Sequence, residues 1–183
     1  VFTGGTTVNS GTVQFNSASA LGKGTITIDG GANASTFRTL NSSFFETFNP
    51  IVTNEKLNVV MSGVTRWTMN GPISGNAGVR NAGVGTLVLR GNNTYGGSTL
   101  IEGSTAGTVS EVFFYNNANL GAPSTPVVFR DPTGGGAGSA LTYDGIGSID
   151  LTHPLQVDAN SEARLTPVYT NSTLVVSGGI SGE

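Results

Sequence analysis

The chain has 183 residues, of which 28 are glycine and only 10% are charged, and its formal net charge is −3. Cysteine is absent and His153 is the single histidine, which excludes disulfides, thiolate chemistry and zinc sites that need two histidines. No basic run favours nucleic acid or an anionic membrane as partner, and no apolar stretch reaches the roughly 18 residues of a membrane-spanning helix. Residues 1–5 do not resemble a signal peptide, so we expect the chain to be part of a longer protein.

Short runs rich in threonine, valine and aromatic residues predict β-strands. In chain order these runs are residues 6–8, 12–15, 25–28, 57–61, 65–69, 86–89, 111–114, 127–129, 140–143, 148–151 and 173–176. They recur at intervals of roughly 10–13 residues, which is typical of a sandwich, a barrel or a solenoid. The best helical candidate, residues 17–21, is a single turn. The chain is therefore predicted to be all-β.

An internal repeat of about 100 residues decides between these architectures. Residues 4–11 (GGTTVNSG) match residues 96–103 (GGSTLIEG), and an aromatic residue, Phe2 or Tyr95, precedes each copy. Further matches follow in the same order: residues 15–22 with 114–121, 49–51 (NPI) with 153–155 (HPL), and 71–75 with 178–182. We therefore predict a first unit over residues 1–91, which begins within a repeat, and a second unit of the same continuous structure over residues 92–183.

A solenoid explains the short strands better than two separate sandwiches, because no linker lies between the units. One coil cannot bury its apolar face alone, so coils stack and share one core. At roughly 20–25 residues a coil, each unit would supply four or five coils, stacked at about 4.8 Å. We expect a rod about 40 Å long in which matched residues occupy equivalent coil positions.

One segment resembles a known family. Residues 85–103 (GTLVLRGNNTYGGSTLIEG) are similar to the autotransporter-associated β-strand repeat, in which a G-T-L-x-L strand precedes G-x-N-T-Y and a glycine pair. Residues 1–11 resemble the second half of that motif, whereas residues 32–58 and 122–147 depart from its spacing. The resemblance implies a right-handed parallel β-helix in the passenger region of a secreted or surface-displayed protein.

Parallel β-helices also include enzymes that cut polysaccharides, and these need two carboxylates, or an acid with calcium and a base, facing one groove. The candidates are Asp144 and Asp150, with Asp158, Glu162 and Arg164 downstream. We expect them to be separate charges at turns and coil edges.

Two single residues are also weighed. His153 could act as a general base, but its match in the first unit is Asn49, which favours a structural role. Asp131, between Arg130 and Pro132, is typical of a turn.

The glycine-rich segments do not predict a ligand site. Residues 134–138 lack the aspartate of a calcium-binding G-G-x-G-x-D repeat and are interpreted as a flexible loop. Gly83-Val84-Gly85 precedes no helix, which argues against a phosphate loop.

The aromatic residues fall into two sets. One set forms either buried rows or a sugar-binding face: Phe2, Phe15, Trp67, Tyr95, Phe113, Phe114 and Phe129. The other lies in an Asn- and Ser-rich stretch and is assigned to the core, a cap or a contact patch: Phe37, Phe44, Phe45 and Phe48.

The sequence thus predicts an all-β, right-handed parallel β-helix built from two divergent units, with no catalytic, cofactor-binding or metal-binding residue and no cofactor. The expected role is a non-enzymatic stalk, fibre or adhesin scaffold that is extracellular or displayed on a bacterial surface. The expected partners are adjacent repeats or neighbouring copies end to end, and a surface glycan or cell-surface partner. Two alternatives stay open: a polysaccharide-acting β-helix enzyme and a carbohydrate-binding adhesin module.

Overall fold

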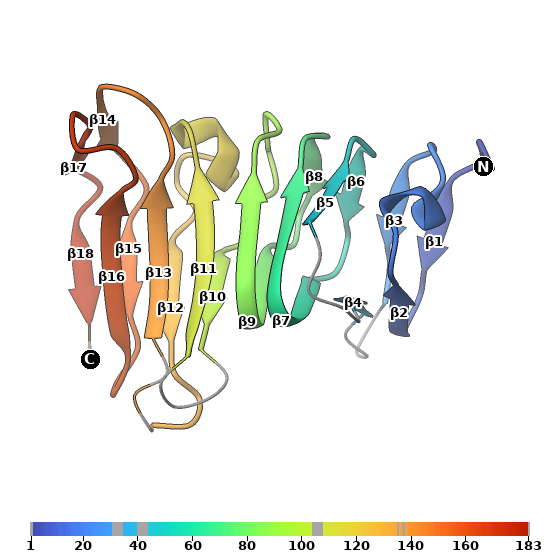
Figure 1. The fold of residues 1–183 in the computed structure, drawn as a ribbon, viewed down its shortest axis with the longest axis horizontal. Helices are drawn as coiled ribbons and strands as arrows, with labels where there is room; N and C mark the ends of the chain where they lie inside the picture. Colours follow the sequence, from blue (N-terminus) through green and yellow to red (C-terminus); the bar gives the residue numbers. More distant parts are fainter. Residues whose placement is uncertain are drawn as a thin grey trace.

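The chain forms a parallel β-solenoid of about seven coils that stack along the long axis of the molecule (Figure 1). The structure is a computed structural model and describes residues 2–30, 35–39, 44–103, 108–134, 136 and 138–182. All strand pairs within these ranges run parallel. The all-β class and the parallel solenoid predicted from the sequence are confirmed.

Each coil has three faces, numbered here in chain order, and the first half of the chain visits them regularly. The first face carries β1 (Thr6–Val8), β3 (Ile26–Ile28), β6 (Ile51–Thr53) and β8 (Ile73–Gly75). The second carries β2 (Gly11–Phe15), β4 (Ser35–Thr39) and the first halves of β7 (Leu57–Met69) and β9 (Val79–Leu89). The third carries the 3₁₀ turn η1 (Ala18–Leu21), β5 (Phe44–Thr47) and the second halves of β7 and β9.

The second half of the chain visits the same faces with a shift of one face. The second face continues through β10 (Thr99–Glu102), β12 (Val127–Arg130), β15 (Leu155–Val157) and β18 (Ile180–Gly182). The third continues through β11 (Val109–Phe114), β13 (Gly138–Tyr143) and β16 (Glu162–Pro167). The first continues through η2 (Asn117–Leu120), β14 (Ser148–Leu151) and β17 (Thr173–Val176).

The shift arises because residues 93–97 insert one extra segment between β9 and β10. The N–H of Thr94 donates to the Ile73 carbonyl at 2.8 Å and that of Gly96 to the Gly75 carbonyl at 2.9 Å, so this segment lies over β8. β10 then pairs with the first half of β9, and β11 pairs with the second half. One repeat therefore spans four coils plus one face, and the second copy is rotated by about a third of a turn around the axis.

Strand registers repeat between the two copies in spite of this rotation. On β1, β3, β6 and β8 the aligned residues are Thr6, Ile26, Ile51 and Ile73. On β10, β12, β15 and β18 they are Thr99, Val127, Leu155 and Ile180. Thr6 thus corresponds to Thr99, so the sequence alignment of the two glycine pairs is wrong by one residue. The predicted boundaries of the units, 1–91 and 92–183, stay a prediction.

The aromatic residues before each first strand have the same backbone contacts but different surroundings. The Phe2 carbonyl accepts from the Lys23 N–H at 3.2 Å, and the Tyr95 carbonyl accepts from the Ala122 N–H at 3.0 Å. Tyr95 is fully buried, whereas Phe2 is 50% exposed. Their positions are equivalent, but the two rings do not share the environment expected of matched residues. The coil that contains β8 and β9 packs beside Tyr95, whereas no described coil precedes Phe2.

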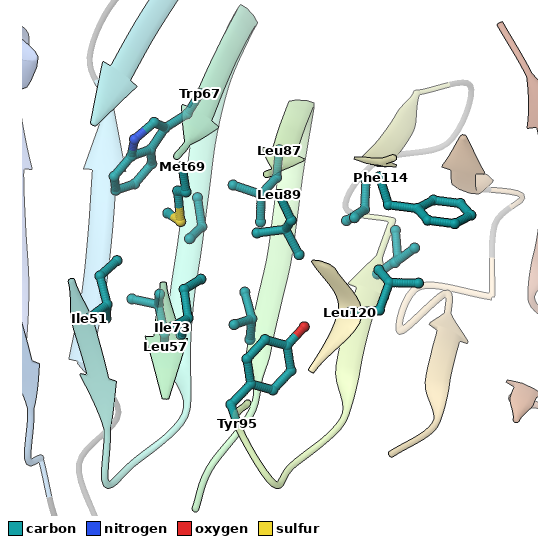
Figure 2. Close-up of a cluster of buried hydrophobic side chains, with 14 of the residues drawn as sticks. Ile51, Leu57, Trp67, Met69, Ile73, Leu87, Leu89, Tyr95, Phe114 and Leu120 are labelled. Atoms are coloured by element: carbon teal, nitrogen blue, oxygen red, sulfur yellow. The ribbon is translucent and has the colours of Figure 1, made fainter. Parts of the chain in front are cut away.

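The core is one continuous column of apolar side chains that point inward from the three faces (Figure 2). Phe15 lies at the centre of its N-terminal part, with ring centroids of Phe37, Phe45 and Trp67 at 6.2, 5.8 and 5.1 Å. Further along, Leu87, Leu89 and Phe114 continue the column (Figure 2). Sharing this column gives strands of three to five residues the burial that they lack alone.

Several observed strands were not predicted from the sequence. They are β4, β5, β6, β8, β10, β15, β16 and β18, and most of them are short or rich in serine and threonine. Residues 57–61 and 65–69, predicted as two strands, form the single strand β7 with an irregularity between Met61 and Thr65.

Replacing the glycine that follows each 3₁₀ turn should test the difference between the two aromatic positions. Gly22 and Gly121 both have positive φ, at 68° and 90°. A Cβ on Gly121 would lie 2.5 Å from the Tyr95 ring, and that ring has no free space to move into. We expect Gly121→Ala to lower the free energy of unfolding by about 3 kcal/mol and Gly22→Ala by about 1 kcal/mol, because the half-exposed Phe2 ring can move aside. Equal losses in urea unfolding would contradict the assignment.

Alkaline unfolding should report on Tyr95. Burial raises the pKa of its phenol, against a smaller opposing effect of the hydrogen bond with the Thr99 hydroxyl at 2.5 Å. The folded state therefore resists ionisation, and stability should fall once the pH passes about 10, where the unfolded phenol ionises. Tyr95→Phe should lose about 1 kcal/mol at neutral pH but show a flatter decline above pH ~10. Identical alkaline slopes for the wild type and Tyr95→Phe would refute this.

Candidate functional surface

A ladder of alternating charges runs along the outer side of the solenoid across four coils. Arg80 on β9 donates to Glu102 on β10, and Glu102 lies 3.9 Å from Arg130, its register partner on β12. Arg130 in turn donates from Nε to Asp158 at 2.6 Å. The Glu102 side chain is only 10% exposed, so it is held between two cations at the junction of the two repeat units. The ladder carries no excess charge, which makes it a brace between coils.

A second outer cluster surrounds Asp144. Its carboxylate accepts from Arg66 at 3.3 Å and from the Tyr115 hydroxyl, which also accepts from Arg90. The guanidinium groups of Arg66 and Arg90 lie 5.0 and 4.4 Å from the ring centroids of Phe113 and Tyr115. Partial burial, and then the hydrogen bond to Asp144, raise the pKa of Tyr115, which stays a neutral donor. Like the ladder, this cluster joins residues of both units.

The carboxylates weighed as an active site have separate partners. Asp144 binds Arg66 and Tyr115, Asp158 binds Arg130, and Asp150 is exposed. Glu162 accepts from Arg164 at 2.8 Å, which lowers the pKa of Glu162. Within the described ranges, no hydrogen bond or ion pair joins two of these carboxylates or joins one of them to His153.

His153 is fully buried between two main-chain carbonyls. Its Nδ1 lies 2.9 Å from the Thr125 oxygen and its Nε2 lies 3.0 Å from the Asn117 oxygen. At the matched position, Asn49 donates from Nδ2 to the oxygens of Gly24 and Gly22 at 2.8 and 3.3 Å. Both ring nitrogens of His153 thus face main-chain carbonyls within the core, and neither is exposed to a substrate.

Asp131 organises its own turn. Its carboxylate accepts from the N–H and hydroxyl of Thr133 and from the N–H of Gly136, and its N–H donates to the Ser161 hydroxyl at 2.8 Å. The turn predicted around Asp131 is therefore present. The predicted flexible loop at residues 134–138 lies partly outside the described residues. In the part of the chain that is described, no three carboxylate or imidazole side chains gather where they could hold a metal ion.

The aromatic residues divide between the core and the surface. The buried ones are Phe15, Phe37, Phe45, Trp67, Tyr95, Phe114 and Phe129. Phe113 is half-buried beneath Arg66, whereas Phe44, the first residue of β5, and Phe48, which follows β5, are 81% and 71% exposed. The sequence did not separate these exposed rings from Phe45, although the alternation of a strand places Phe44 and Phe48 on the opposite side.

Grooves lie beside both 3₁₀ turns. One, of about 420 Å³, runs between η1 and β5 and is lined by Ala18, Ser19, Gly22, Lys23, Glu46, Thr47, Phe48 and Asn49. Another of the same volume lies beside η2 and is lined by residues 92–94, 117, 118 and 121–123. Each groove thus lies beside a 3₁₀ turn that stands where the following coil has a strand.

Comparison with known proteins found a partial similarity. An extracellular serine protease from Serratia marcescens is 36% identical to this chain over 97 residues. The match covers 49% of this chain and 9% of that protein, so the chain spans a small part of the relative's length. No protein-family model and no solved structure matches the chain. Similarity to an extracellular protein fits the resemblance seen in the sequence, and the particular repeat family stays a prediction.

No helix among the described residues has the length and apolar character needed to cross a membrane.

Removing Glu102 should show that the charge ladder braces the fold. Glu102→Ala leaves Arg80 without its carboxylate in a mostly buried position, and we expect the free energy of unfolding to fall by about 2 kcal/mol. Glu162→Ala is the matched control, because Glu162 and Arg164 are both about half exposed, and it should have no measurable effect. Urea unfolding of the two variants gives the comparison, and equal stabilities would refute the brace.

Proposed function

We propose that this chain is a non-enzymatic structural segment of a secreted or surface-displayed protein, in which it serves as a rigid rod. The observation that carries the proposal is the stacking of coils from β1 to β18, with one apolar column inside and paired charges outside. Bending such a rod requires breaking strand ladders and exposing core side chains, and both are costly.

The extracellular location rests on the similarity to an extracellular protease and on the resemblance to a surface-displayed repeat. The absence of cysteine is compatible with export, because folding needs no disulfide step. Protease activity is not carried over from the relative. The single histidine of this chain is buried against two carbonyls, and the chain matches only 9% of that protein.

The junction at β9 suggests how repeats join. There the first coil of one unit stacks on the last coil of another, with Thr99 opposite Val79 and Glu111 opposite Thr86. Adjacent repeats, in the same chain or in a neighbouring copy, are proposed to stack in the same registers. Every join of this kind would turn the next unit by one face.

Two measurements on the purified chain test the proposal. Small-angle X-ray scattering should give the profile of a rod with a constant cross-section, and incubation with casein and with neutral and acidic polysaccharides should release no product. A flexible, bent particle would overturn the rigid rod. Hydrolysis that is lost in His153→Asn or Asp150→Asn would overturn the non-enzymatic role. Hydrolysis that both variants retain at the wild-type rate would identify a contaminating enzyme.

A further inference from the structure

The open edge of β14 is closed by one primary carboxamide. The Asn117 Nδ2 donates to the Asp150 carbonyl oxygen at 2.8 Å, and its Oδ1 accepts from the Thr152 N–H at 3.2 Å. β14 pairs on its other side with β17, while the position beside Asn117 holds η2 in place of a strand. One side chain therefore bonds to both main-chain groups that a neighbouring strand would otherwise reach.

The same main-chain pair exists in the first unit without the carboxamide. η1 corresponds to η2, since residues 21–22 match residues 120–121, and Ala18 stands where the second unit has Asn117. β5 corresponds to β14 in its pairing with the following coil, so Glu46 and Phe48 stand at the positions of residues 150 and 152.

Strand geometry directs this pair toward η1. The Thr47 carbonyl accepts from the Asn70 N–H at 2.8 Å, so Thr47 bonds toward β7. Because alternate residues of a parallel strand bond to opposite neighbours, the Glu46 carbonyl and the Phe48 N–H face the other way. Among the described residues no group bonds to either of them, and the methyl group of Ala18 cannot.

The groove between η1 and β5 gives access to this pair from solvent. Its volume is about 420 Å³, and the Phe48 ring beside it is 71% exposed. Lys23 and Glu46 contribute one positive and one negative charge to its lining. The groove therefore favours neither an anion nor a cation, and suits a neutral polar group with an apolar stem.

We propose that this groove binds a primary carboxamide, namely the side chain of a glutamine or asparagine residue on a partner polypeptide. The carboxamide N–H donates to the Glu46 carbonyl, and its oxygen accepts from the Phe48 N–H. The carbon stem passes over the Ala18 methyl group to the solvent and packs against the Phe48 ring. This binding goes beyond the rod function, because the stacking of coils does not depend on it.

The geometry of the pair selects this chemical group. A primary carboxamide presents an N–H and its oxygen side by side on one edge. A carboxylate lacks the donor, an ammonium group lacks the acceptor, and the N–H and oxygen of a trans secondary amide point in opposite directions. The carboxamide of Asn117 spans the matched pair in the same fold.

The test measures binding of a short peptide by NMR chemical shifts of the chain. The probe has one glutamine between two glycines, an acetylated amino end and an N-methylamide at the carboxyl end, so the glutamine side chain is its single primary carboxamide. Matched controls carry glutamate or methionine in place of glutamine. We expect millimolar binding of the glutamine peptide, with perturbed resonances at residues 18–23 and 46–49, and at least tenfold weaker binding of both controls, which lack the donor.

Two outcomes with these peptides would overturn the proposal. Equal affinity for the three peptides would assign the groove to a peptide main chain, whose extended residues also present an N–H and a carbonyl on one side. Absence of binding by the glutamine peptide would leave the main-chain pair to solvent.

Variants of η1 locate the site. Ala18→Asn should supply an internal carboxamide, as in the second unit, and reduce the affinity at least tenfold while thermal stability is kept or raised. Ala20→Asn is the matched control, because it adds an amide to the same turn at a residue that does not line the groove, and it should leave the affinity unchanged. Phe48→Ala is the independent variant if Ala18→Asn folds poorly, and it should weaken binding several-fold by removing the ring beside the stem. Equal losses in Ala18→Asn and Ala20→Asn, or unchanged affinity in both Ala18→Asn and Phe48→Ala, would refute the site.

Discussion

Every other feature of this molecule depends on the parallel backbone ladder that joins each coil to the next. A strand such as β6, with three residues, gains neither hydrogen bonds nor burial unless coils stand on both sides of it. Because the ladder supplies the backbone partners, the side chains are free to be polar where they face inward. Ser35 of β4 and Ser139 of β13 are fully buried, and each donates to a carbonyl on the preceding face of the solenoid, that of Val8 in β1 or Ile101 in β10. The ladder therefore determines stability, while the apolar column fills the space it encloses.

Where the ladder is interrupted, side chains replace it. The extra segment between β9 and β10 is bound by Asn93, whose Oδ1 accepts from the Ile73 N–H and whose Nδ2 donates to the Asn119 carbonyl. Asn119 in turn donates to the Gly91 carbonyl at 2.9 Å. The charge ladder around Glu102 and the cluster around Asp144 cross this same junction on the outside. Buried amides and outer ion pairs thus hold together the two units at the place where the faces shift.

The architecture could be predicted from the sequence because the repeat length and the spacing of turns are typical of a solenoid. The strands β14 and β17 were predicted with their observed bounds, and the matched residues Phe15 and Phe114 both lie in the core. Strands such as β4 were missed, because Ser35 and Thr39 are buried by stacking that a single strand does not encode. The shift of one face could not be predicted, since it depends on which strand β10 pairs with. Nor could the pairing of Asn117 with β14, which joins residues more than 30 apart in the chain.

At some matched positions, the two units place different side chains beside the same main-chain groups. The carbonyls of Gly24 and Thr125 occupy matched positions, and one receives an amide donor from Asn49 while the other contacts the ring of His153. The Asn49 amide nitrogen donates to two carbonyls, whereas each ring nitrogen of His153 lies beside one carbonyl. A second difference lies at the edge of β14, where the Asn117 amide bonds to the Asp150 carbonyl and the Thr152 N–H. The matched residue beside β5 is Ala18, whose methyl group forms no hydrogen bond.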